Sequence, residues 1–183
     1  MVYLKDKYKF PVVNKVEFSK AFKNSYFSKS NLPKLIVKGL TKLDVAIDTD
    51  GNFIAGKSTL ILTSSDPNKL MLVAAILNSS LAIRYIKEKY SSASYNGGIV
   101  FTKDMINNLP VNFENSFITN KITNVVKVII DKKYEDLLAN IDEEQLLIDM
   151  YVFKLYNFEY AELLDIIDDI KFSEPQYNSL KLQ

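Results

Sequence analysis

The stretch that decides the fold runs from Asn68 to Pro110 and reads NKLMLVAAILNSSLAIRYIKEKYSSASYNGGIVFTKDMINNLP. Residues 70–77 are apolar at every position, and residues 81–89 combine apolar and charged side chains at helical spacing. This pattern predicts one helix of about six turns, buried on all sides at its start and solvated at its end. We expect residues 70–83 to be scaffold and residues 84–98 to be the working part.

A polar loop, Ser91–Gly98, follows the predicted helix and leads into a short β-branched strand at residues 99–102. The loop carries small hydrogen-bonding side chains and closes on two glycines. A buried helix, such a loop and a strand together predict a rigid platform that presents the loop to a ligand.

The flanking segments complete the fold class. Residues 32–40, the segment from Val45 and residues 59–63 predict strands, and Asp48-Thr49-Asp50-Gly51-Asn52 is typical of a hairpin turn. Ser65 or Asp66 is expected to cap the central helix. Apolar residues at helical spacing predict helices over residues 116–133, 137–158 and 160–170.

The prediction is an α+β fold in three parts. Residues 1–112 form an α/β part with a mixed β-sheet around a buried central helix. Residues 113–172 form a helical region that packs on this part or on a partner, and residues 173–183 form a tail that is loose or pairs weakly. Without a signal-peptide pattern or an uninterrupted apolar span, the chain is expected to be cytoplasmic, with no membrane partner.

Composition limits the chemistry. The chain has no cysteine and no histidine, which removes thiolate metal sites, most zinc sites and the common nucleophile–histidine pairs. The overall charge of +1 hides a division: residues 1–110 hold 16 Lys/Arg against 8 Asp/Glu, whereas residues 111–183 hold 7 against 14. A basic first part predicts a surface that binds a polyanion. The lysines could also serve only to solvate the protein.

Two patterns suggest enzymatic sites but lack the necessary context. Gly51–Ser58 (GNFIAGKS) matches the phosphate-loop pattern, which requires a helix directly after the lysine, yet residues 59–63 predict a strand. Two strands joined by Asp-Gly, with Gly56 as a bulge, explain the segment better. Acidic residues at 44, 48 and 50 belong to a turn-forming segment, and those at 165, 168 and 169 to a solvated helix end.

Several segments, in order, resemble one protein family. Leu32-Pro33-Lys34-Leu35-Ile36-Val37-Lys38 resembles a K-P-K-I-L-V-R strand, and Ala75-Ile76-Leu77-Asn78-Ser79-Ser80-Leu81 is similar to an A-I-L-N-S-K-L helix. Gly97–Lys103, followed by Leu109-Pro110-Val111, resembles a G-G-x-x-F-x-K … L-P-I ending, and residues 142–158 resemble a closing helix. These segments resemble the TaqI-like C-terminal specificity domain, the target recognition domain of N6-adenine DNA methyltransferases and of fused restriction–modification enzymes.

The resemblance implies a reader of double-stranded DNA that is not an enzyme by itself. The family's catalytic domain carries an Asn/Asp-Pro-Pro-Tyr/Phe motif, and no two prolines are adjacent here. This chain is therefore expected to hold no cofactor. S-adenosylmethionine would bind a methyltransferase or nuclease catalytic domain or subunit that is its partner.

Candidate DNA contacts follow from the expected positions of the side chains. Base edges are assigned to the loop residues Ser92, Ser94, Tyr95 and Asn96, because amide side chains pair with adenine and small polar groups donate and accept. Phosphates are assigned to basic residues near strand ends, turns and the solvated helix end, namely Lys34, Lys38, Lys42, Lys57, Arg84, Lys87, Lys89 and Lys103. Two alternatives stay open: a module that docks a methyltransferase or nuclease subunit, and a nucleotide-binding enzyme that uses Gly51–Ser58.

Overall fold

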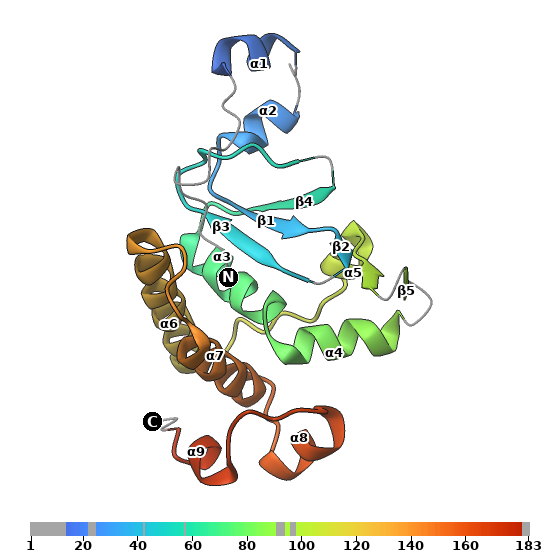
Figure 1. Cartoon of the computed structure of the whole chain (residues 1–183), viewed down its shortest axis with the longest axis vertical. Coiled ribbons are helices and arrows are strands. Elements are labelled where there is room, and N and C mark those ends of the chain that lie inside the picture. The colour runs from blue at the N-terminus through green and yellow to red at the C-terminus, as the bar shows by residue number, and fades with distance from the viewer. Residues whose placement is uncertain are drawn as a thin grey trace.

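The computed structural model describes residues 14–21, 25–41, 43–56, 58–90, 94–95 and 98–180. Its helices are α1 (Lys15–Ala21), α2 (Ser25–Ser30), α3 (Pro67–Leu77), α4 (Ser80–Lys89), α5 (Lys103–Asn107), α6 (Ser116–Glu135), α7 (Asp142–Leu155), α8 (Tyr160–Ile166) and α9 (Glu174–Asn178). Its strands are β1 (Lys34–Lys38), β2 (Leu40–Thr41), β3 (Val45–Asp48), β4 (Thr59–Thr63), β5 (Ser94–Tyr95) and β6 (Gly98–Val100). The predicted α+β class is confirmed (Figure 1).

The main sheet has the strand order β3-β1-β4, and each pairing within it is antiparallel. The sheet was predicted to be mixed, and that part of the prediction is wrong for the pairings that the structure describes. Only six residues, 39–44, separate β1 from β3, whereas a parallel pair needs a crossover of a dozen residues or more.

The predicted hairpin at Asp48–Asn52 is also wrong, because β3 and β4 lie on opposite edges of β1. The Asp48 carboxylate accepts hydrogen bonds from the backbone N–H groups of Asn52 (3.0 Å) and Phe53 (2.9 Å). These bonds direct the chain away from β3, so it does not fold back to pair with that strand. Gly51 does adopt the positive φ of 68° expected at Asp-Gly. Residues 52–56 have no regular structure, so Gly56 is not a strand bulge.

A second, smaller antiparallel sheet has the order β2-β6-β5. It is joined to the main sheet at Gly39, whose backbone N–H donates to Ser58 (3.0 Å) and whose carbonyl accepts from Phe101 (2.9 Å). A Cβ on Gly39 would lie 2.5 Å from the Ser58 carbonyl oxygen, so the close approach of these backbones requires glycine.

The predicted central helix is two helices, α3 and α4, bent by 65° at Asn78-Ser79. Asp66 caps α3 by accepting from Asn68 N (2.9 Å), which confirms one of the two predicted caps. Ser79 ends the first helix and begins the second, since its hydroxyl donates to Ile76 O (2.6 Å) and accepts from Ala82 N (3.3 Å). A serine that caps locally in this way competes with helix continuation.

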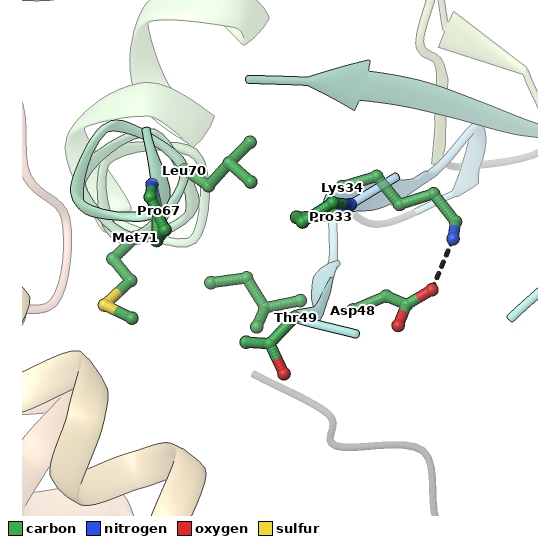
Figure 2. A pocket seen from close by; sticks show the side chains of 8 residues that line it. Pro33, Lys34, Asp48, Thr49, Pro67, Leu70 and Met71 are labelled. Carbon is green, nitrogen blue, oxygen red and sulfur yellow. Dashed lines mark hydrogen bonds and ion pairs between the residues drawn. The ribbon is translucent and has the colours of Figure 1, made fainter. Parts of the chain in front are cut away.

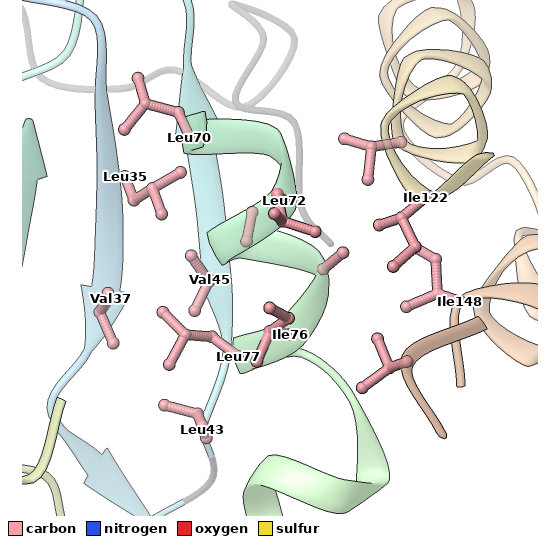
Figure 3. Packing of buried hydrophobic residues seen from close by; sticks show 14 of the residues in the cluster. Leu35, Val37, Leu43, Val45, Leu70, Leu72, Ile76, Leu77, Ile122 and Ile148 are labelled. Atoms are coloured by element: carbon pink, nitrogen blue, oxygen red, sulfur yellow. The ribbon is translucent and has the colours of Figure 1, made fainter. Parts of the chain in front are cut away.

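The hydrophobic core surrounds α3. Figure 3 shows Leu35 and Val45 of the main sheet on one side of α3, and Ile122 of α6 and Ile148 of α7 on the other. All four side chains are buried. The helical region therefore packs on the α/β part and completes a shared core.

The C-terminal residues are more ordered than predicted. Instead of a loose tail, residues 174–178 form α9, which begins with a capping box between Ser173 and Gln176. Tyr177 is 0% exposed, and its hydroxyl donates to Phe158 O (2.6 Å). Tyr177 belongs to a second hydrophobic cluster, together with Phe153, Leu163 and Phe172, and these contacts anchor the segment. Hydropathy along the last residues did not reveal them.

Candidate nucleic-acid interface

Several of the predicted DNA contacts lie outside the described residues. These are Lys42, Lys57, Ser92 and Asn96. Ser94 and Tyr95 form the short strand β5, which pairs with β6 through Ser94↔Ile99 and Tyr95↔Gly98. Two of the residues predicted to read bases thus form an edge strand of the small sheet.

Lys34 was predicted to contact phosphate, and the structure contradicts this assignment. Its side chain is 0% exposed, and its ammonium donates to the Asp48 carboxylate and to Ser30 O (2.8 Å). In the sequence a lysine at this position of β1 is expected to face solvent. The structure instead buries it at the start of the strand, with its ammonium directed away from α3 (Figure 2). It pairs the start of β1 with the end of β3, and no phosphate reaches it.

Two other predicted phosphate contacts, Lys38 and Lys103, are exposed at the small sheet. Lys38 ends β1 and Lys103 begins α5, and the Phe101–Gly39 backbone hydrogen bond brings their segments together. Neither pairs with a carboxylate among the residues that the structure describes. They are cations available to a ligand at this edge.

The last turn of α4 supplies two more exposed cations, Lys87 and Lys89. The Lys89 ammonium donates to the Tyr85 hydroxyl (2.6 Å) and lies 5.0 Å and 5.8 Å from the ring centroids of Tyr85 and Tyr90. The Tyr85 hydrogen bond raises the pKa of Lys89 and so favours its charged form. Figure 1 shows this end of α4 on the same side of the molecule as β2, β5 and α5.

Arg84, one turn earlier on α4, is already engaged. Its guanidinium contacts Glu88 (2.7 Å) and Asp168 (3.5 Å), the latter from the segment between α8 and α9. Asp168 was predicted to lie on a solvated acidic face, and its side chain is 92% exposed. Its contact with Arg84, a candidate DNA-binding residue, depends on the tertiary structure and was not predicted from the sequence.

The phosphate-loop pattern at Gly51–Ser58 lacks the required geometry. Its serine is followed by strand β4, as predicted, and not by a helix whose amides could hold phosphates. Gly51 is needed for another reason: a Cβ there would lie 2.4 Å from the Asn31 carbonyl oxygen. Asp131, the acid that would complete such a site, lies in α6.

A metal centre and a ligand cavity are the two remaining kinds of candidate site. Among the described residues, no group of three acidic side chains is arranged to hold a metal ion. A cavity of about 80 Å³ lies between β1, β3 and α3, lined mainly by apolar side chains such as Pro33, Ile47 and Met71. Figure 2 shows the Lys34 ammonium pointing away from α3 toward Asp48. A cavity of this size and lining does not accommodate a nucleotide.

A junction at the bend between α3 and α4 was not predicted from the sequence. The Asn78 side chain pairs with both backbone groups of Val45, accepting from its N–H (3.0 Å) and donating to its carbonyl (3.1 Å). From α7, Gln145 donates to Asn78 O (3.1 Å), and Asp149 accepts from Ser80 N (2.9 Å). The only signal in the sequence was the polar Asn-Ser-Ser interruption of an apolar run.

Asp149 is a carboxylate whose pKa is perturbed by its position at this junction. Burial raises its pKa to about 6, and the Ser80 hydrogen bonds offset only part of that effect. It is ionised at neutral pH in a setting that disfavours the charge, at the N-terminus of the helix that carries Arg84, Lys87 and Lys89.

Within the described part of the chain, no single helix is long and apolar enough to cross a membrane; α3 and α4 together have the length and composition of a span but are bent. A scan against models of protein families finds no match, and a search of the curated proteins finds no relative.

Proposed function

We propose that this chain is a cytoplasmic, non-catalytic specificity domain that recognises double-stranded DNA for a restriction–modification adenine methyltransferase. The observation that carries the proposal is a set of exposed lysines at element ends on one side of the molecule. Lys38 ends β1, Lys103 begins α5, and Lys87 and Lys89 lie in the last turn of α4, on the side that also holds the small sheet (Figure 1). Lysines that flank a polar segment suit DNA recognition, because phosphate contacts position a protein while base contacts specify the sequence.

The order of the family-like segments supports the same proposal. They run from residue 32 to about residue 158, and their described residues coincide with β1, the α3–α4 junction, β6 with α5, and α7. Methyl transfer and S-adenosylmethionine binding belong, in this proposal, to a catalytic domain or subunit that joins this chain on the DNA. This chain contributes affinity and choice of sequence.

A labelled duplex library, titrated across a salt series, tests the proposal. We expect binding whose logarithm falls linearly with the logarithm of salt concentration. Lys38→Ala and Lys103→Ala should each weaken binding to all duplexes and reduce the salt slope by about 1. Lys127→Ala is the matched control, because Lys127 is an exposed lysine on α6. Absence of binding at low salt would refute the proposal for this chain.

One set of observations favours the second candidate, a module that docks a methyltransferase or nuclease subunit. Leu138 (75%), Leu164 (61%) and Val128 (46%) are exposed apolar residues of the C-terminal region. If docking is the function, changing these residues to serine should abolish co-purification with that subunit and leave the DNA salt slope unchanged. A chain that docks the subunit but does not bind DNA would favour this candidate.

A further inference from the structure

The start of α4 is held from two sides. On one side, Asn78 bonds to the backbone of Val45 in β3. On the other, α7 provides Gln145 and Asp149, whose side chains bond to Asn78 O and Ser80 N. Ser80 is the first residue of α4, so Asp149 accepts one of the N–H groups that a helix leaves unpaired at its N-terminus.

The chemistry of this contact favours a fixed direction for α4. A carboxylate at a helix N-terminus interacts with the positive end of the helix dipole and with a backbone donor together. The contact joins residues 69 positions apart, so it ties the acidic C-terminal region to the basic helix. The same region touches α4 again through Asp168 and Arg84 (3.5 Å).

Asp149 is an unfavourable residue for stability alone. Its carboxylate is largely buried, and burial raises its pKa, which means that the folded protein disfavours the charge it carries at neutral pH. An apolar side chain at this position would avoid that cost. A position that lowers stability but fixes the direction of a helix is typical of a residue with a functional task.

We infer that Asp149 is a positioning residue for the candidate nucleic-acid interface, which sets the direction of α4 through the Ser80 backbone N–H. The inference rests on the proposed function. From Ser80 to Lys89 the helix is about 14 Å long, so a tilt of roughly 10° at its start moves its end by about 2 Å. Preorganised binding constellations are held to within about 0.5 Å, and such a tilt moves the helix end by more than that margin.

Two substitutions remove the contact from opposite sides. Asp149→Leu removes the acceptor and the buried charge. Ser80→Pro removes the donor, and it is compatible with the helix start because proline is favoured at the first helical position and Ser79 has the extended backbone (φ −79°, ψ 154°) that precedes proline. Asp149→Asn keeps an acceptor oxygen and is the conservative variant. Asp142→Asn, an exposed acid on α7, is the control for charge.

The experiment compares DNA affinity, thermal stability and amide hydrogen exchange of α4 in these variants. We expect Asp149→Leu and Ser80→Pro each to weaken DNA binding by about three- to tenfold, with no further loss in the double variant. Asp149→Leu should do so without lowering the melting temperature. Asp149→Asn should restore most of the affinity, and α4 amides should exchange faster in the two disruptive variants alone.

The outcomes separate this inference from the proposed function. Wild-type affinity in both disruptive variants, or losses that add in the double variant, would overturn the inference and leave the DNA-binding function standing. A loss of affinity that only follows the loss of melting temperature would also overturn it, because that result indicates general destabilisation. A wild-type chain that binds no duplex would overturn both.

Discussion

The side-chain amide of Asn78 makes the two hydrogen bonds to Val45 that a neighbouring strand would make. It accepts from the Val45 N–H at 3.0 Å and donates to the Val45 carbonyl at 3.1 Å. β3 is an edge strand, so without Asn78 these two groups of Val45 would have no partner from the sheet. We expect Asn78→Ala to lower the free energy of unfolding by about 2–4 kcal/mol, measured by denaturant titration.

The matched control for Asn78 is Asn108→Ala. Asn108 is exposed, and its amide makes a single bond to Asp104 O (2.8 Å), so we expect a loss of at most about 1 kcal/mol. Equal losses in the two variants would mean that Asn78 does not cover the edge of β3.

A second prediction concerns the buried Lys34–Asp48 pair. Lys34→Met removes the cation but leaves the Asp48 carboxylate, which is 2% exposed, without its strongest partner. Breaking such a pair from one side costs about 3–5 kcal/mol of unfolding free energy. Under conditions where the variant is folded, its affinity for duplex DNA and its salt slope should equal those of the wild type. A reduced salt slope would restore Lys34 as a phosphate contact.

The third prediction follows from Asp149. Its pKa in the folded protein, about 6, lies above its ordinary value of 3.8, so the folded state holds a proton there that the unfolded state has released between pH 4 and 6. This group's contribution therefore favours folding at pH 4 and is lost as the pH rises to 6. Relative to the wild type, Asp149→Asn should gain about 3 kcal/mol across that interval.

Chemical denaturation at several pH values measures this difference. The advantage of Asp149→Asn should be near zero at pH 4, grow to pH 6 and stay constant above it. An advantage that is independent of pH would show that burial does not perturb Asp149.

The fourth prediction concerns Arg84, which Asp168 holds at 3.5 Å. Asp168→Asn releases part of the guanidinium charge, and we expect tighter duplex binding by about two- to fivefold, since an exposed ion pair contributes at most about 1 kcal/mol. Arg84→Ala should weaken binding and leave the fold intact. Asp169→Asn is the control, because Asp169 pairs with Lys171 instead. Equal effects of both aspartate variants would indicate net charge alone.

Local patterns in the sequence predicted most of the fold. The apolar run at residues 70–77, the cap at Asp66 and the helical spacing after Pro110 each depend on neighbours within a few turns, and all correspond to observed elements. The bend at Asn78 and the crossing from β3 to β4 depend on partners far along the chain, such as Val45 and Lys34. A sequence pattern does not contain these contacts.

The same distinction applies to the candidate site. Exposed lysines at element ends, such as Lys38, Lys87 and Lys103, were predicted from position alone. The prediction for Lys34 was wrong because its carboxylate partner, Asp48, is 14 residues away. Asp149 was not predicted because its partner, Ser80, is 69 residues away. Charged residues whose roles depend on burial need the tertiary structure.

The packing of α3 has a consequence for synthesis on the ribosome. The sheet side of this helix has its partners once β4 and α3 have emerged, but the other side waits for Ile122 and Ile148. Until those residues leave the exit tunnel, the nascent chain displays an apolar helix face. We expect chains terminated near residue 112 to bind chaperones or aggregate, and full-length chains to escape only when α7 is complete.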